Sequence, residues 1–193
     1  MEHDANYSRG KPVKAYKAII FDRDGTLNAT SKSEGGYVLS KDEMILLPYV
    51  QESLARLKAR GVRLYVFTQQ RCIGKKMLTE DGLVEIHQRL NTLLGKTAQI
   101  DAYYHCPHLI EDGCDCSKPK PGMLFKCLND YQLNPEDVLV VGDSLRDYES
   151  AKAAGLDFSF VPNDTGKHTH EEYIATGQPF YKNLQELVFD MYR

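Results

Sequence analysis

The apolar run at residues 18–21 limits the possible folds of this chain more than any other stretch. Its sequence, A-I-I-F, is apolar at consecutive positions, as strands buried on both faces of a parallel sheet are. Asp22 and Asp24 follow at once, and Gly25 allows the chain to turn sharply. Side chains two residues apart on an extended chain project from the same side. The stretch therefore predicts a buried strand that carries two carboxylates to one edge of a sheet.

Further apolar runs alternate with stretches of helical periodicity. Strands are expected at 62–67, 100–104, 138–141 and 158–161, and helices at 79–94, 121–131, 145–154 and 184–189, with another helix opening at Pro48. Residues 28–46 lack periodicity and are expected to form a flap over the end of the first strand. The alternation predicts an α/β fold, a Rossmann-like parallel sheet with helices on both faces.

Length and charge limit the possible functions. A chain of 193 residues with 42% hydrophobic content predicts one domain, at 17–193, after a polar leader at 1–16. A net charge of −3 indicates no nucleic-acid partner. No stretch approaches the ~20 apolar residues of a membrane span, and no signal peptide is evident. We expect a cytoplasmic monomer without membrane contact.

Polar residues at the ends of the predicted strands suggest a catalytic site. Thr68 follows the second strand and Asp143 the fourth, and the carboxyl ends of parallel strands meet at one edge. Close carboxylates require a compensating positive charge, which Lys118 or a metal ion can supply. One carboxylate, Asp22, can attack a phosphoryl group while a second, Asp24, moves protons. The pattern is typical of phosphoryl transfer, although an Asp-Gly turn or a helix cap would explain each motif alone.

Four motifs in order resemble those of the haloacid dehalogenase-like phosphohydrolases. They are D-R-D-G-T at 22–26, Thr68, Lys118 in K-P-K-P, and G-D-S-L-R-D at 142–147. The resemblance implies that Asp22 is the nucleophile and Asp24 the general acid and base. It also implies a Mg²⁺ ion held by Asp22, Asp143 and the backbone carbonyl of Asp24, with Asp147 as a supporting acid.

A group of potential metal-binding side chains precedes Lys118 in the sequence. Cys106, His108, Cys114 and Cys116 form C-x-H-x5-C-x-C within eleven residues. An odd total of five cysteines and the lack of an export signal disfavour disulfides. The spacing predicts a structural Zn²⁺ site that fixes the loop. Free thiols are the alternative, and His105 is a less suitable ligand because it would point away from its neighbour Cys106.

The cysteine loop narrows the resemblance. Together with K-P-K-P-G-M-L at 118–124 and G-Y-V at 36–38, it is similar to the group of histidinol-phosphatases and D-glycero-D-manno-heptose 1,7-bisphosphate phosphatases. This resemblance implies a core without a large cap domain, whose loops, the zinc-bound loop included, shape the pocket. It also implies a small phosphorylated metabolite as the partner.

Three positions depart from that group. It commonly has Asn, Arg and Lys where this chain has Gln69, Ser117 and Ser144, and the last two positions usually bind substrate. The loss of two cations weakens the case for a bisphosphate substrate. Arg71, Lys75 and Lys76 can compensate for that loss, unless they are simply solvated surface residues. The substrate-binding residues expected from the sequence are Arg23, Gln69, Arg71, Ser117 and Ser144.

We therefore expect a Mg²⁺-dependent phosphatase that forms an aspartyl-phosphate, with the heptose 1,7-bisphosphate as its substrate. Histidinol phosphate is the alternative substrate. A nucleic-acid 3′-phosphatase would share the chemistry, but the chain lacks a basic stripe interleaved with aromatic residues. A non-catalytic, zinc-stabilised interaction module is disfavoured because Asp22, Asp24, Lys118 and Asp143 are all present.

Overall fold

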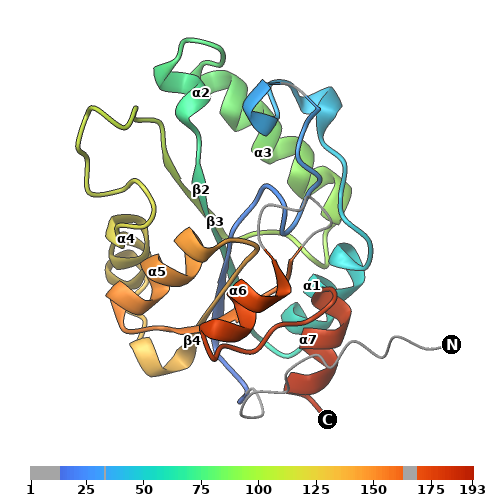
Figure 1. The fold of residues 1–193 in the computed structure, drawn as a ribbon. Helices are drawn as coiled ribbons and strands as arrows, with labels where there is room; N and C mark the ends of the chain where they lie inside the picture. Colours follow the sequence, from blue (N-terminus) through green and yellow to red (C-terminus); the bar gives the residue numbers. More distant parts are fainter. Residues whose placement is uncertain (1–13, 33, 163–168) are drawn as a thin grey trace, which may run out of the picture.

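The computed structural model describes residues 14–32, 34–162 and 169–193. Five parallel strands form one sheet in the order β3-β2-β1-β4-β5 (Figure 1). The strands are β1 (Ala18–Phe21), β2 (Arg63–Gln69), β3 (Ala102–Cys106), β4 (Val138–Gly142) and β5 (Asp157–Phe160). The predicted parallel α/β sheet is confirmed, and its central strand is the one that precedes Asp22.

Helices cover both faces of the sheet. They are α1 (Val50–Lys58), α2 (Arg71–Gly74), α3 (Glu80–Leu94), α4 (Gly122–Asp130), α5 (Leu145–Ala154), α6 (His170–Ala175) and α7 (Leu184–Met191), with 3₁₀ turns η1 (Glu34–Gly36), η2 (Lys41–Glu43) and η3 (Pro135–Asp137). One face packs against α1, α3 and α7, and the other against α4, α5 and α6 (Figure 1). None of the helices in the described ranges has the length and apolar character needed to cross a bilayer.

The two hydrophobic cores explain why β1 is apolar at every position. Ile19 and Phe21 belong to the core on one face, whereas Ala18 and Ile20 belong to the core on the other, and all four are 0% exposed. A strand that is covered on both sides has no polar face. Its first residues with access to solvent come after Phe21, where the site begins.

Several element boundaries differ from the sequence prediction. β2 includes Thr68 and Gln69 because its pairing with β3 continues as far as Gln69 and Cys106. β3 begins only at Ala102, since the carboxylate of Asp101 accepts a hydrogen bond from the Leu64 amide at 2.7 Å. Helix α1 begins at Val50 rather than at residue 48 because Tyr49 has a left-handed backbone with φ 66°.

Two short helices and one core residue were not predicted. The signal for α6 was present, since Thr169 and Glu172 form a capping box at its start, whereas α2 has only four residues. Tyr16 was assigned to the polar leader, but it is buried in the core and its hydroxyl donates to Asp157 at 2.9 Å. Residues 1–13 of the leader lie outside the described residues.

Candidate active site

A cavity of about 330 Å³ opens at the carboxyl ends of β1, β2 and β4. Nine of the residues expected in the site line it: Asp22, Asp24, Thr68, Gln69, Arg71, Lys118, Asp143, Ser144 and Asp147. Arg23, Ser117, Lys75 and Lys76 do not. The flap at 28–46 contributes Thr30, Gly35, Gly36 and Tyr37, and α5 contributes Arg146, which the sequence reasoning missed. The fold thus brings the four motifs to one place.

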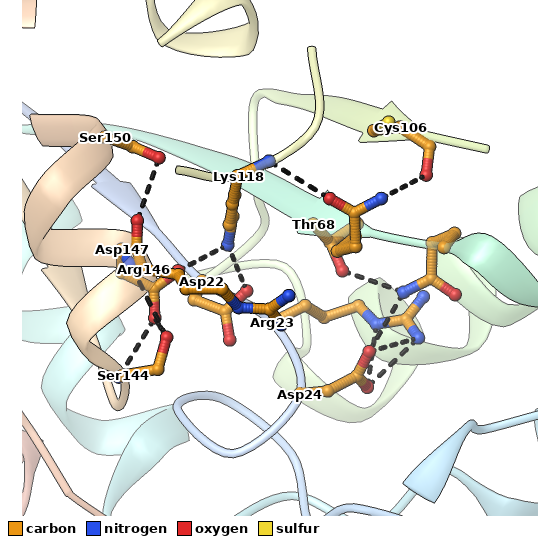
Figure 2. Close-up of polar contacts among 12 residues, drawn as sticks. Asp22, Arg23, Asp24, Thr68, Cys106, Lys118, Ser144, Arg146, Asp147 and Ser150 are labelled. Atoms are coloured by element: carbon orange, nitrogen blue, oxygen red, sulfur yellow. Dashed lines mark hydrogen bonds and ion pairs between the residues drawn. The ribbon is translucent and has the colours of Figure 1, made fainter. Parts of the chain in front are cut away.

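Lys118 joins two carboxylates in the deepest part of the cavity. Its Nζ donates to Asp22 Oδ1 at 2.6 Å and to Asp147 Oδ1 at 2.7 Å (Figure 2). The three residues are only 4%, 7% and 1% exposed, respectively. Nζ also lies 3.6 Å from the centre of the Phe67 ring, which attracts a cation. The ammonium is therefore held in place from several sides.

Burial and nearby charges shift the pKa of Asp22 and of Lys118. It raises the pKa of Asp22 to about 6, an effect that Lys118 opposes and that the charge of Asp147 reinforces. Burial by itself would lower the pKa of Lys118, but the charges of Asp147 and Asp22 raise it above its usual value. A buried carboxylate with a raised pKa is more stable as the anion when a further cation comes close.

Carboxylate oxygens of Asp22, Asp143 and Asp147 lie within 4.8 Å of one another. Hard oxygen donors in such a cluster suit Mg²⁺, so these residues fit the ion that the motifs imply. Both oxygens of Asp147 already accept hydrogen bonds, from Lys118 on one side and from the Ser144 amide and hydroxyl at 3.0 and 2.6 Å on the other. Gly142 makes room for it, since a Cβ there would lie 2.6 Å from that of Asp147.

Asp24 faces away from Lys118 and is held by other residues. Its Oδ1 accepts from Arg23 Nε at 3.1 Å and its Oδ2 accepts from Arg23 Nη2 at 2.8 Å (Figure 2). Oδ1 also accepts from Asn28 at 2.9 Å. The backbone turn that follows closes on the carbonyl of Arg23, which accepts the amides of residues 26–28, rather than on that of Asp24. The carboxylate reaches the cavity while its position is fixed from behind.

Arg23 lies behind the cavity and does not contact it. Its side chain is fully buried, and Nη1 lies 3.2 Å from His87 Nε2. Burial, and then the charge of Arg23, lowers the pKa of His87 to about 2, so the imidazole is neutral and Nε2 accepts the hydrogen bond. Arg23, which the sequence predicts to contact substrate, is therefore not among the residues that line the cavity. His87 lies on α3 and carries no local sequence signal for this role.

Gln70 connects two of the predicted catalytic residues. Its Nε2 donates to Asp24 Oδ2 at 2.9 Å and to Thr68 Oγ1 at 2.8 Å, and the residue is 0% exposed. Because the Thr68 oxygen accepts this hydrogen bond, its own proton is free to be donated into the cavity. Gln70 was missed by the sequence analysis, which considered only the residues on either side of it.

Gln69 and Ser117 hold the backbone near Lys118. Gln69 Oε1 accepts from Ser117 Oγ at 3.2 Å and from the Lys118 amide at 3.1 Å, and its Nε2 donates to the Cys106 carbonyl at 3.4 Å. Ser117, which the sequence predicts to bind substrate, supports the segment and is not among the residues that line the cavity. Ser144 lines the cavity, and its hydroxyl caps helix α5 in a capping box with Asp147.

The predicted cysteine loop brings its four side chains together. Sulfur–sulfur distances are 3.6 Å for Cys106 and Cys114 and 3.5 Å for Cys114 and Cys116, and His108 Nδ1 lies 3.2 Å from the Cys116 sulfur. These distances exclude disulfides, whose sulfurs are about 2.05 Å apart. They approach the edge of about 3.8 Å of a tetrahedron with metal–sulfur bonds of about 2.3 Å. The cluster therefore fits a tetrahedral metal ion.

Neighbouring contacts orient this loop. His105 points away from it and pairs with Glu80 at 2.8 Å. The amide of Gly74 in α2 donates to the Pro107 carbonyl at 3.0 Å, and the amide of Gly122 in α4 donates to the Asp115 carbonyl at 3.1 Å. A side chain at residue 74 or 122 would collide with these backbone atoms. Glycine at both positions lets the loop pack closely beside the cavity.

Comparison with known proteins agrees with this geometry. Residues 27–155 match the family model described as haloacid dehalogenase-like hydrolase. The chain is 34% identical over 158 residues to the D-glycero-beta-D-manno-heptose-1,7-bisphosphate 7-phosphatase of Neisseria meningitidis serogroup A, covering 81% of this chain and 83% of the relative. It is 34% identical over 176 residues to the enzyme of the same name from Pseudomonas putida, covering 91% and 99%.

A solved structure adds information about ligands. The D,D-heptose 1,7-bisphosphate phosphatase of B. bronchiseptica, in complex with magnesium and phosphate, superposes with a TM-score of 0.81 and 31% identity, covering 91% of this chain and 97% of that one. The match to the family model begins at Leu27, after both aspartates. The arrangement of Asp22 and Asp24 therefore supports membership of the family independently of that match. This chain belongs to the haloacid dehalogenase-like hydrolase family, as its motifs predicted.

Proposed function

We propose that this protein, a phosphoric monoester hydrolase of its family, removes one phosphoryl group from D-glycero-D-manno-heptose 1,7-bisphosphate through an aspartyl-phosphate on Asp22. The observation that carries the proposal is the buried cluster of Asp22, Lys118, Asp143 and Asp147 at the floor of the cavity. Relatives that share about a third of their residues over most of the chain carry the name of this activity.

The residues of the site have the following roles in the proposed reaction. A carboxylate oxygen of Asp22 attacks phosphorus, the bond from phosphorus to the sugar oxygen breaks, and Asp24 in its acid form gives its proton to that oxygen. Water then attacks the phosphorus of the aspartyl-phosphate, Asp24 takes the proton of the water, and phosphate leaves Asp22. Lys118 and the Thr68 hydroxyl offer hydrogen bonds to the phosphoryl oxygens.

A Mg²⁺ ion held by Asp22, Asp143 and the backbone carbonyl of Asp24 would neutralise charge on the phosphoryl group. Asp147 keeps Lys118 in position, because it accepts the second hydrogen bond of the ammonium at 2.7 Å. For proton transfer, Asp24 must free at least one oxygen from Arg23, Asn28 or Gln70, which occupy both oxygens in this structure.

The cysteine loop has a structural role in this proposal. Cys106, His108, Cys114 and Cys116 would hold Zn²⁺ in a closed tetrahedral site. Since Cys116 is separated from Lys118 by one residue, the ion would also limit the motion of the catalytic lysine. Elemental analysis should find about one zinc per chain, and a metal-free protein that keeps full activity and stability would contradict the assignment.

The substrate is tested by measuring phosphate release from two compounds, the heptose 1,7-bisphosphate and histidinol phosphate, with Mg²⁺ and with a chelator. We expect turnover of the bisphosphate alone, lost on chelation and restored by Mg²⁺. Preference for histidinol phosphate would replace the substrate but keep the chemistry. Inactivity toward both, and toward p-nitrophenyl phosphate, would favour a non-catalytic role. Light scattering on the same sample tests the expected monomer, and cell fractionation tests its cytoplasmic location.

A further inference from the structure

Two arginines line the cavity from opposite sides of the nucleophile. Arg71 is the first residue of α2, shortly after β2, and Arg146 lies in the first turn of α5, after β4. Strand β1, which carries Asp22, lies between β2 and β4 in the sheet. In Figure 2, Arg146 is on the Asp147 side of Asp22, opposite the β2 residue Thr68. The two side chains therefore flank the place where a phosphoryl group would react.

Neither arginine has an acidic partner within residues 14–32, 34–162 and 169–193. No ion pair of the described residues involves Arg71 or Arg146. The Nε atom of Arg71 is buried and lacks a hydrogen-bond partner there, an arrangement that costs stability unless a ligand supplies an acceptor. The other cations of the site differ, because Lys118 binds two carboxylates and Arg23 is sealed behind Asp24.

The positions that usually carry substrate-binding cations in the group that this chain resembles hold Ser117 and Ser144. Their hydroxyls donate to Gln69 and Asp147, respectively, and Ser117 does not line the cavity. Arg71 and Arg146 place two positive charges in the same cavity from different positions of the chain. The two arginines therefore equal in number the two cations that are absent at positions 117 and 144.

We propose that Arg71 and Arg146 form a subsite for the second, non-transferred phosphoryl group of a sugar bisphosphate. The inference rests on the proposed function, and it assigns the substrate a second anionic group. Guanidinium groups bind phosphate by paired, charge-assisted hydrogen bonds. The floor of the cavity, with Asp22 and Lys118, takes the phosphoryl group that reacts. A cavity of about 330 Å³ is at the small end of ligand sites and suits a metabolite of this size.

The test compares the binding of matched compounds by calorimetry in the presence of Mg²⁺, in an Asp22→Asn background that cannot form the phosphoenzyme. One pair of probes is fructose 1,6-bisphosphate and fructose 6-phosphate, and the other is the heptose 1,7-bisphosphate and heptose 7-phosphate. We expect each bisphosphate to bind about 100-fold more tightly than its monophosphate, with about tenfold from each arginine. Arg71→Met and Arg146→Met should each reduce that ratio about tenfold, and the double variant should remove it.

Arg89→Met is the control, since Arg89 is exposed on α3 away from the cavity, and it should keep the ratio. Equal weakening of both members of a pair in the Arg71 and Arg146 variants would overturn the subsite, as would a background protein without preference for either bisphosphate. Tighter binding of fructose 1,6-bisphosphate than of fructose 6-phosphate, combined with failure of the wild-type protein to hydrolyse the heptose 1,7-bisphosphate, would retain the subsite and reject only the proposed substrate.

Discussion

Lys118 and Arg23 both neutralise carboxylates of the loop that follows β1, but they face different surroundings. Lys118 lines the cavity, and its ammonium is shared between Asp22 and Asp147. Arg23 is fully buried outside the cavity lining, and its guanidinium binds Asp24 on one side and His87 on the other. One cation can transfer its hydrogen bonds to a substrate, whereas the other can act only through Asp24.

The difference explains how two aspartates separated by one residue can have different tasks. Asp22 shares a hydrogen-bond donor that lines the cavity, so a phosphoryl group can use the same ammonium while the proposed nucleophile keeps its charge balance. Asp24 is positioned by a rigid, planar guanidinium that makes several hydrogen bonds to it. The proposed task of each aspartate thus depends on the cation that binds it, Lys118 for Asp22 and Arg23 for Asp24. Replacing these cations tests the comparison between them.

The largest effect is expected from replacing Asp22, the proposed nucleophile. Asp22→Asn should reduce turnover of any accepted phosphate ester by about 10⁴-fold or more, because the amide cannot form the covalent intermediate. The substitution also removes one charge from a crowded buried cluster, so the protein should fold. Steady-state phosphate release and a thermal melt provide the measurements. Residual turnover within tenfold of the wild type would reject the role of Asp22.

Lys118→Met should affect stability as well as turnover. Removal of the ammonium leaves Asp22 and Asp147 buried without a counter-charge, and breaking a buried ion pair costs about 3–5 kcal/mol. We expect a loss of this size in urea unfolding of the metal-free protein. The double variant Asp22→Asn with Lys118→Met should recover part of it, since one of the unpaired carboxylates is then gone. Additive losses in the double variant would show that the two residues are not coupled.

Replacement of Arg23 should have a smaller effect, and mainly on kcat. Arg23→Lys keeps the charge but loses the planar guanidinium, so Asp24 becomes less well positioned and kcat should fall about 10- to 100-fold. KM should change little because Arg23 does not line the cavity. Arg71→Lys is the matched control, with a change expected in KM. A rise in KM at constant kcat for Arg23→Lys would instead indicate that Arg23 contacts the substrate.

The sequence was sufficient to predict residues whose roles depend on position along a strand. Asp22, Asp24 and Asp143 follow buried strands, and parallel topology brings strand ends together. It could not show on which side of the loop Arg23 would lie, because that depends on His87, 64 residues away. Arg146 was missed for a similar reason. Nothing in the G-D-S-L-R-D motif says which side chain of the first turn of α5 faces the cavity.

The smallest expected effect is on the pH dependence of stability, and it tests the buried contact between Arg23 and His87. The pKa of His87 is lowered from 6.5 in the unfolded chain to about 2 in the folded protein. Between these values the unfolded state binds more protons, so stability decreases as the pH falls below 6.5. His87→Gln keeps an acceptor for Arg23 but does not titrate.

From pH 7.5 to pH 5.5, the wild type should therefore lose about 1.4 kcal/mol more stability than His87→Gln, as measured by urea unfolding at each pH. The contributions of all other ionisable groups are common to the two proteins and cancel in the difference. Parallel stability curves would mean that His87 has the same pKa in the folded and unfolded protein. Its ring would then not be buried against Arg23, which would remove the contact that distinguishes Arg23 from Lys118.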